Sequence, residues 1–140
     1  MSTHARGTFD VKVTPQPSEE NVGHSTVGRL ALFKQFHGDL EGTAWGQMLT
    51  MGTAVEGSAG YVAMDHVSAT LQGRQGTFAL QHLGTMGRGA MQMNITVVPD
   101  SGADELVGIS GRLIIQIIEG KHYYDFEYTL PDAPRVEEGE

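Results

Sequence analysis

The sequence is 140 residues long, with 9 basic and 17 acidic residues and a formal net charge of -8. This length suits one domain with a core of its own, and the negative charge repels phosphate backbones, so we expect no nucleic-acid partner. The absence of cysteine excludes a disulfide scaffold, an iron–sulfur cluster, a zinc–cysteine site and a cysteine nucleophile.

Alternating hydrophobicity and glycine predict a chain of short strands. The 19 glycines fall mostly between or inside runs in which apolar and polar residues alternate, as in a strand with one buried face. In chain order, the expected strands are residues 9–14, 29–37, 40–51, 61–71, 77–81, 91–97, 106–118 and 123–130. Eight antiparallel strands favour a closed barrel over a sandwich, because closure removes exposed edges. The predicted fold is therefore an all-β, eight-stranded antiparallel barrel with little helix.

The two ends of the sequence are polar. Residues 1–7 contain no apolar run of the kind a signal peptide needs, and residues 132–140 are rich in glutamate after Pro131 and Pro134. No uncharged apolar stretch approaches the roughly 20 residues of a membrane-spanning helix. We expect one domain over residues 1–131, an acidic tail over 132–140, no membrane insertion and a cytoplasmic location.

The seventh expected strand, residues 106–118, is apolar on both faces. Ile115 and Ile117 lie on one face, while Ile114 and Ile118 lie on the other. A barrel strand with an apolar outer face needs cover from a terminal segment or a second subunit, which favours an oligomer.

Four blocks of spaced glycine and polar residues recur in order between about residue 33 and residue 111. They are Phe36, Gly38, Asp39, Leu40, Glu41, Gly42; Tyr61, Met64, Asp65, Val67; Leu71, Gly73, Arg74, Gly76, Thr77, Phe78, Leu80, Gln81, His82, Gly84, Thr85; and Val97, Val98, Pro99, Ser101, Gly102, Glu105, Leu106, Gly108, Ile109, Gly111. In these blocks the sequence resembles an uncharacterised bacterial family of domains of unknown function, DUF3224, whose members have an allene oxide cyclase-like barrel. The resemblance implies an eight-stranded barrel and an oligomer, a homodimer or homotrimer, but the family has no general activity to carry over.

Glu41 and His82 are the two candidate catalytic residues. Glu41 shares its strand parity with Trp45 and Met51; if that face is internal, the carboxyl group lies in an apolar cavity and can exchange protons. The alternative is a glutamate that binds backbone amides in the turn at residues 38–42, because the sequence leaves open which parity faces the lumen. His82 shares parity with Phe78, so it is either a proton shuttle inside the barrel or a neutral core histidine.

Aromatic residues supply candidate ligand contacts, with an ordinary aromatic core as the alternative. The candidates are Trp45, Tyr61, Phe78, His122, Tyr124, Phe126 and Tyr128. The histidines show no HxH or HxxxH spacing, so we expect no metal and no cofactor. His66 and Asp65 are adjacent and point to opposite faces, which favours a structural role for Asp65.

The sequence best fits a barrel that binds a hydrophobic small molecule. Small residues leave room inside an eight-stranded barrel, namely Gly42, Ala44, Gly46, Ala63 and Ala69. One alternative is a cofactor-independent isomerase or cyclase in which Glu41 or His82 moves a proton, and a second is a structural or protein-interaction module. The sequence is thus compatible with a binding protein and with an enzyme.

Overall fold

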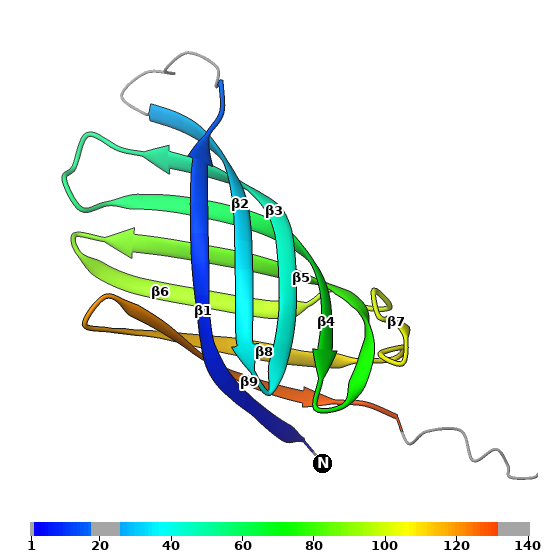
Figure 1. Cartoon of the computed structure of the whole chain (residues 1–140). Coiled ribbons are helices and arrows are strands. Elements are labelled where there is room, and N and C mark those ends of the chain that lie inside the picture. The colour runs from blue at the N-terminus through cyan, green and yellow to red at the C-terminus, as the bar shows by residue number, and fades with distance from the viewer. Residues whose placement is uncertain (1, 18–25, 132–140) are drawn as a thin grey trace, which may run out of the picture.

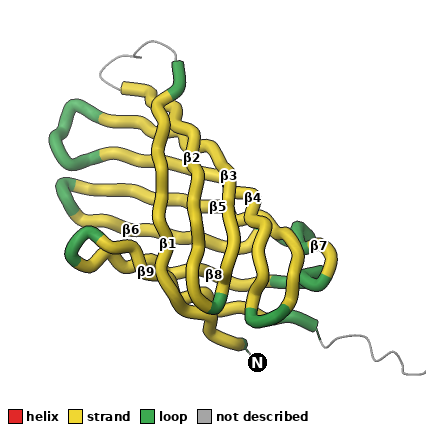
Figure 2. Tube along the Cα trace, in the orientation of Figure 1, coloured by secondary structure: helices red, strands yellow, loops and turns green. Residues whose placement is uncertain are grey.

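The computed structural model describes residues 2–17 and 26–131, and within them it contains strands and turns but no helix (Figure 2). No segment of this part of the chain therefore forms a helix able to cross a membrane. The strands are β1 (Thr3–Pro15), β2 (Thr26–Gly38), β3 (Leu40–Gly52), β4 (Ala59–Leu71), β5 (Arg74–Gly87), β6 (Ala90–Val97), β7 (Ala103–Asp104), β8 (Ser110–Ile118) and β9 (Lys121–Thr129). The acidic tail expected over residues 132–140 lies outside the described residues.

Eight of the strands close into a barrel. Each pairs antiparallel with its neighbours in the order β1, β2, β3, β4, β5, β6, β8 and β9, and β9 pairs with β1 (Figure 1). The two-residue strand β7 pairs only with β5. The predicted eight-stranded antiparallel barrel is confirmed.

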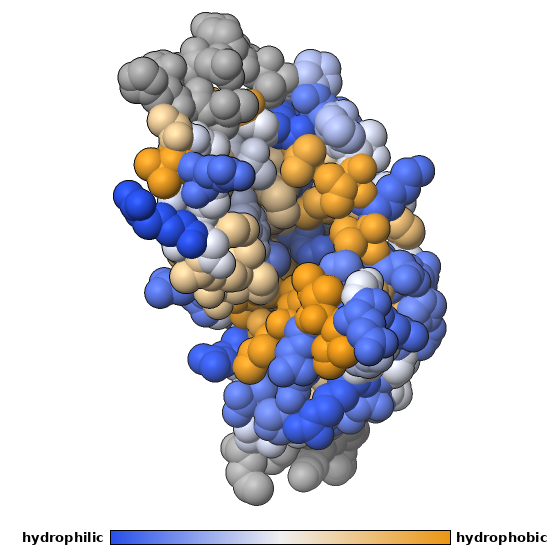
Figure 3. All heavy atoms as spheres, turned by 90° about the vertical axis from the view of Figure 1, so that its left-hand side faces the viewer, coloured by the Kyte–Doolittle hydropathy of each residue, from blue (hydrophilic) through white to orange (hydrophobic). Residues whose placement is uncertain are grey.

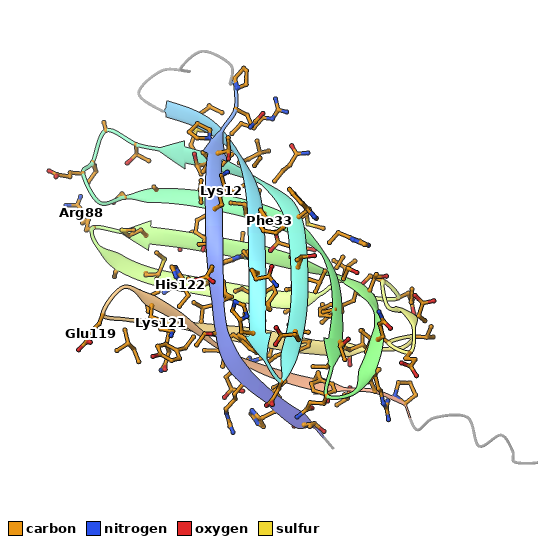
Figure 4. The ribbon with its side chains drawn as sticks, viewed as in Figure 1. Lys12, Phe33, Arg88, Glu119, Lys121 and His122 are labelled. Carbon is orange, nitrogen blue, oxygen red and sulfur yellow. The ribbon has the colours of Figure 1, made fainter. Side chains whose placement is uncertain are left out.

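Two of the strand connections at one end of the barrel are two-residue turns. Arg88 and Gly89 connect β5 to β6 with φ of 51° and 94°, while Glu119 and Gly120 connect β8 to β9 with φ of 51° and 82°. Positive φ at both positions matches the twist of antiparallel strands, and glycine at the second position adopts it without strain. Figure 4 shows Arg88, Glu119 and Lys121 at this end, which we call the open end.

The expected strand over residues 106–118 is wrong in its first part. Asp104 and Gly108 have left-handed backbone, with φ of 59° and 84°, so the chain turns repeatedly and β8 starts only at Ser110. Leu106 and Ile109 are 0% and 2% exposed and pack into the core from this irregular segment. The segment lies at the end of the barrel opposite the open end (Figure 1), which we call the closed end.

The hydrophobic core fills the barrel toward the closed end. Phe78 and Phe126 are fully buried, and their rings stack with centroids 5.6 Å apart. The other large, fully buried side chains are Phe36, Leu40, Val67, Leu71, Leu80 and Leu106. This half of the barrel therefore has no room for a ligand.

Candidate functional site

The barrel is hollow toward its open end. Met91, Met93 and Ile117 share strand parity with buried core residues and so face inward, yet they are 49%, 39% and 61% exposed. Figure 3 looks onto this end and shows hydrophobic residues gathered around a hollow. The inner wall of the open half is therefore apolar and reachable from outside.

A buried ion pair lies inside the barrel. Nζ of Lys34 on β2 lies 2.7 Å from Oδ2 of Asp65 on β4, with the two side chains 9% and 2% exposed. The strand between them, β3, places Ala44 beside Lys34 and Gly46 beside Asp65. The ammonium group also lies 5.8 Å from the centroid of the Phe9 ring. Two opposite charges are thus held together among apolar walls.

Tyr61 and His82 form a second polar pair on the same inner surface. The Tyr61 hydroxyl lies 2.8 Å from Nε2 of His82. Tyr61 pairs with Gly84 across β4 and β5, and its ring lies where a Cβ at residue 84 would stand, so the glycine lets the ring lean toward His82. Burial and then the charge of Lys34 lower the pKa of His82 to about 4, against an opposing effect of Asp65. At neutral pH His82 is therefore an uncharged hydrogen-bonding group.

His122 faces the lumen from β9. Its ring lies 5.0 Å from the Phe9 ring, centroid to centroid, and the two residues pair across β9 and β1. Figure 4 shows it next to Lys121 on the strand that follows the turn with Glu119, near the open end. Of the aromatic candidates, His122 and Tyr61 thus lie in the open half.

The even residues of β3 face inward, which resolves the parity that the sequence leaves open. Leu40 and Ala44 are 0% and 1% exposed, whereas Trp45 is 65% exposed and packs on the outside against Phe33, with centroids 4.4 Å apart. Oε1 of Glu41 accepts a hydrogen bond of 3.0 Å from the backbone amide of Gly38. Glu41 therefore has the alternative role, that of a turn residue, and neither Glu41 nor Trp45 lies in the lumen.

The remaining aromatic candidates belong to the closed half. Phe78, Phe126 and Tyr128 pack in the core. The Tyr124 hydroxyl accepts a hydrogen bond from the amide of Leu40 at 2.9 Å and lies 2.9 Å from the carbonyl oxygen of His37, and burial raises its pKa to about 12. These side chains hold the barrel together below the hollow.

The small residues divide in the same way. Gly42, Ala44 and Ala69 lie in the closed half, where a Cβ on Gly42 would collide with Ala69. Gly46 and Ala63 lie beside the polar pairs, opposite Asp65 and His82 respectively. Of the five small residues, only Gly46 and Ala63 therefore leave space next to the hollow.

Lys34 and Asp65 are the site residues that sequence reasoning missed or misjudged. The sequence contains a sign of this pair, because Lys34 lies between the apolar residues Leu32 and Phe36 on the inward face of β2. A charge at such a position needs a buried partner. Asp65, between Ala63 and Val67 on β4, is the only acidic residue in the same situation among those described.

No group of three potential metal ligands occurs in residues 2–17 and 26–131. Three apolar depressions lie on the outer surface of the barrel. One is lined by Trp45, Leu49, Val62 and Met64, a second by Ile114, Ile118 and Tyr123 beside Arg6, and a third by Val27, Met51 and Leu83.

Comparison with known proteins gives a family and a fold but no activity. Residues 5–128 match the model of a family described as "Protein of unknown function (DUF3224)". A crystal structure of a protein with unknown function from the DUF3224 family of Shewanella oneidensis MR-1 is 45% identical, covers 94% of this chain and 99% of that chain, and superimposes with a TM-score of 0.89. No curated protein matches the chain.

Proposed function

The chain belongs to the DUF3224 family, and from the geometry of its barrel we propose that the open half of the lumen binds a small, largely hydrophobic molecule. One observation carries the proposal: inward-facing apolar side chains stay exposed around a hollow whose inner surface holds one buried and one half-buried polar pair. Exposed apolar surface gains about 25 cal/mol for each Å² that a ligand covers. Such walls with a few polar anchors are the usual make-up of a ligand pocket.

Binding is favoured over catalysis by the chemistry of His82. A general base works best with a pKa near the working pH, and a histidine with a pKa of about 4 binds a proton only weakly at pH 7. Glu41, the other candidate, lies on the outer face of β3, where its carboxylate binds the turn that precedes the strand. The Tyr61–His82 pair thus fits the role of a hydrogen-bonding anchor better than that of a proton shuttle.

A proton-transfer isomerase remains the second candidate function, favoured by the 2.8 Å contact between Tyr61 and His82. In that role His82 would take a proton from one atom of an apolar substrate and return it to another while the barrel holds the reacting conformation. Chromatography of bound compounds after long incubation distinguishes the two functions. Conversion that is lost in His82→Gln supports the isomerase, whereas recovery of unchanged compound supports a binding protein.

The methionines allow the proposal to be tested with internal controls. Met48, Met86, Met91 and Met93 face inward, whereas Met51 and Met64 face outward. With ¹³C-methyl methionine, NMR titration with octanol, limonene and naphthol should shift the inward methyl signals and leave the outward ones unchanged. Shifts confined to the outward methyls, or none with any probe, would contradict binding in the lumen. If no inward methyl signal shifts and another protein copurifies by binding the outer surface of the barrel, the protein is an interaction module instead.

A further inference from the structure

The ion pair inside the barrel is incomplete. Asp65 uses Oδ2 to bind Lys34, but its Oδ1 is buried and has no hydrogen-bond partner among the described residues. A buried acceptor without a donor destabilises the fold, and more so when it is charged. Such an atom in an otherwise satisfied core needs an explanation, because buried polar atoms are nearly always hydrogen-bonded.

The backbone of β3 leaves space for this oxygen. Gly46 faces Asp65 across the β3–β4 ladder, and a Cβ at residue 46 would stand where Oδ1 lies. Because a Cβ at an inward position points into the lumen, Oδ1 lies on the lumen side of the sheet. Toward the open end, the next inward residue of β3 is Met48, an unbranched side chain that changes rotamer easily and leaves this side of Gly46 adaptable.

The surrounding groups have no net charge. Lys34 and Asp65 neutralise each other, while His82 is uncharged at neutral pH because burial and the charge of Lys34 disfavour its protonated form. The Tyr61 hydroxyl, which bonds His82, has its pKa raised by burial and is uncharged as well. An ionised ligand group would thus enter an apolar lumen without a free counter-charge, at a large desolvation cost.

From these contacts we infer that the ligand of the open half is an apolar alcohol, whose hydroxyl group donates a hydrogen bond to Oδ1 of Asp65. The inference rests on the proposed binding function and adds the chemical class of the ligand. An uncharged donor satisfies the unpartnered oxygen without adding charge, which a carboxylate cannot do. Gly46 then acts as a specificity residue, because it keeps Oδ1 on the lumen side.

Three probes of matched size test the ligand class: octanol, octanoate and methyl heptyl ether, each titrated against the inward methionine methyl signals. Octanol should bind at least about fivefold more tightly than the other two, equivalent to about 1 kcal/mol. Equal binding of octanol and the ether would mean that a water molecule, not the ligand, donates the hydrogen bond to Oδ1. That result contradicts the inference but leaves the proposed binding in the lumen intact. Tightest binding of octanoate also overturns the inference. Absence of inward shifts with all three probes rejects the binding function itself.

Two variants link the preference to Asp65. The double variant Lys34→Met with Asp65→Leu removes the pair without leaving a buried charge, and should bind octanol and the ether equally. Gly46→Ala places a methyl group against Oδ1 and should also abolish the preference for the alcohol. If Gly46→Ala does not fold, the double variant still decides: an alcohol preference that survives in it contradicts the role of Asp65.

Discussion

The two halves of the barrel interior are built from the same eight strands, but the closed half is a packed core and the open half is hollow. In the closed half, inward positions carry large rings such as Phe78 and Phe126, and the irregular segment with Leu106 seals the end. In the open half, inward positions carry glycine, alanine, methionine and the Tyr61–His82 pair, with the Lys34–Asp65 pair at its boundary with the closed half, and apolar side chains there stay exposed. The packed closed half therefore stabilises the fold. Because it does so, the open half can keep polar side chains and exposed apolar side chains that a filled core would exclude.

The largest expected effect comes from shortening a side chain in the closed half. Phe126→Ala should lower the free energy of unfolding by about 3–5 kcal/mol, because it opens a cavity beside Phe78. Met93→Ala, at an inward position of the open half, should cost about 1 kcal/mol or less, because that side chain already contacts solvent. Urea unfolding of both variants measures the difference. Equal losses would mean that the open half is packed as tightly as the closed half.

The ion pair should behave as a coupled unit. Lys34→Met or Asp65→Leu alone leaves one buried charge unpaired and should cost about 3–5 kcal/mol, while the double variant should recover most of that loss. A double-mutant cycle from urea unfolding gives the coupling energy. If the double variant loses as much free energy of unfolding as the two single variants together, the two charges do not stabilise each other.

The pH dependence of stability should differ between the two halves. The pKa of His82 is lowered to about 4, so between pH 6.5 and 4 the unfolded chain binds a proton that the folded chain does not, and stability is lost as the pH falls. The pKa of Tyr124 is raised to about 12, so between pH 10 and 12 the unfolded chain loses a proton that the folded chain keeps, and stability is lost as the pH rises.

Single variants separate these two effects. His82→Gln should flatten only the acid limb of stability against pH, and Tyr124→Phe only the alkaline limb, both followed by urea unfolding at fixed pH. An acid limb that is unchanged in His82→Gln would assign the loss to other groups.

The sequence predicted the barrel better than the site, and β3 and β8 show why. Period-two alternation identifies strands, but both parities of β3 are apolar, with Ala44 and Met48 on one and Trp45 and Leu49 on the other. Which parity is buried depends on barrel closure, a non-local property. Similarly, the apolar run over 106–118 looked continuous because the left-handed backbone at Gly108 carries no hydrophobic signal of its own.

The polar pairs depend even more on long-range structure. Lys34 and Asp65 are 31 residues apart in the chain and meet only across β3. The sequence marks each as a polar residue on an apolar face, but pairing them requires the strand register. The same holds for Tyr61 and His82, both of which were singled out, though not as partners.

The smallest expected effect concerns the outside of the barrel, where the oligomer expected from the sequence stays a prediction. Trp45 and Ile118 are 65% and 52% exposed on outer faces, and apolar patches of this kind are typical of association surfaces. Light scattering should give a mass two or three times the 15.1 kDa of one chain. Trp45→Ser should lower that mass while changing the stability of the chain by no more than about 0.5 kcal/mol. A wild-type monomer would contradict the prediction.

A pair of neighbouring substitutions on β8 tests the central claim most directly. Ile117 faces the lumen and Ile118 faces outward, with similar exposed fractions of 61% and 52%. A tryptophan at either position adds the same bulk on opposite sides of the barrel wall. If the open half holds the ligand, octanol titrated against the inward methionine signals should bind Ile117→Trp at least about tenfold more weakly than wild type, a loss of about 1.4 kcal/mol. Ile118→Trp should bind like wild type. Unchanged binding in Ile117→Trp, or an equal loss in both variants, would contradict a ligand site inside the barrel.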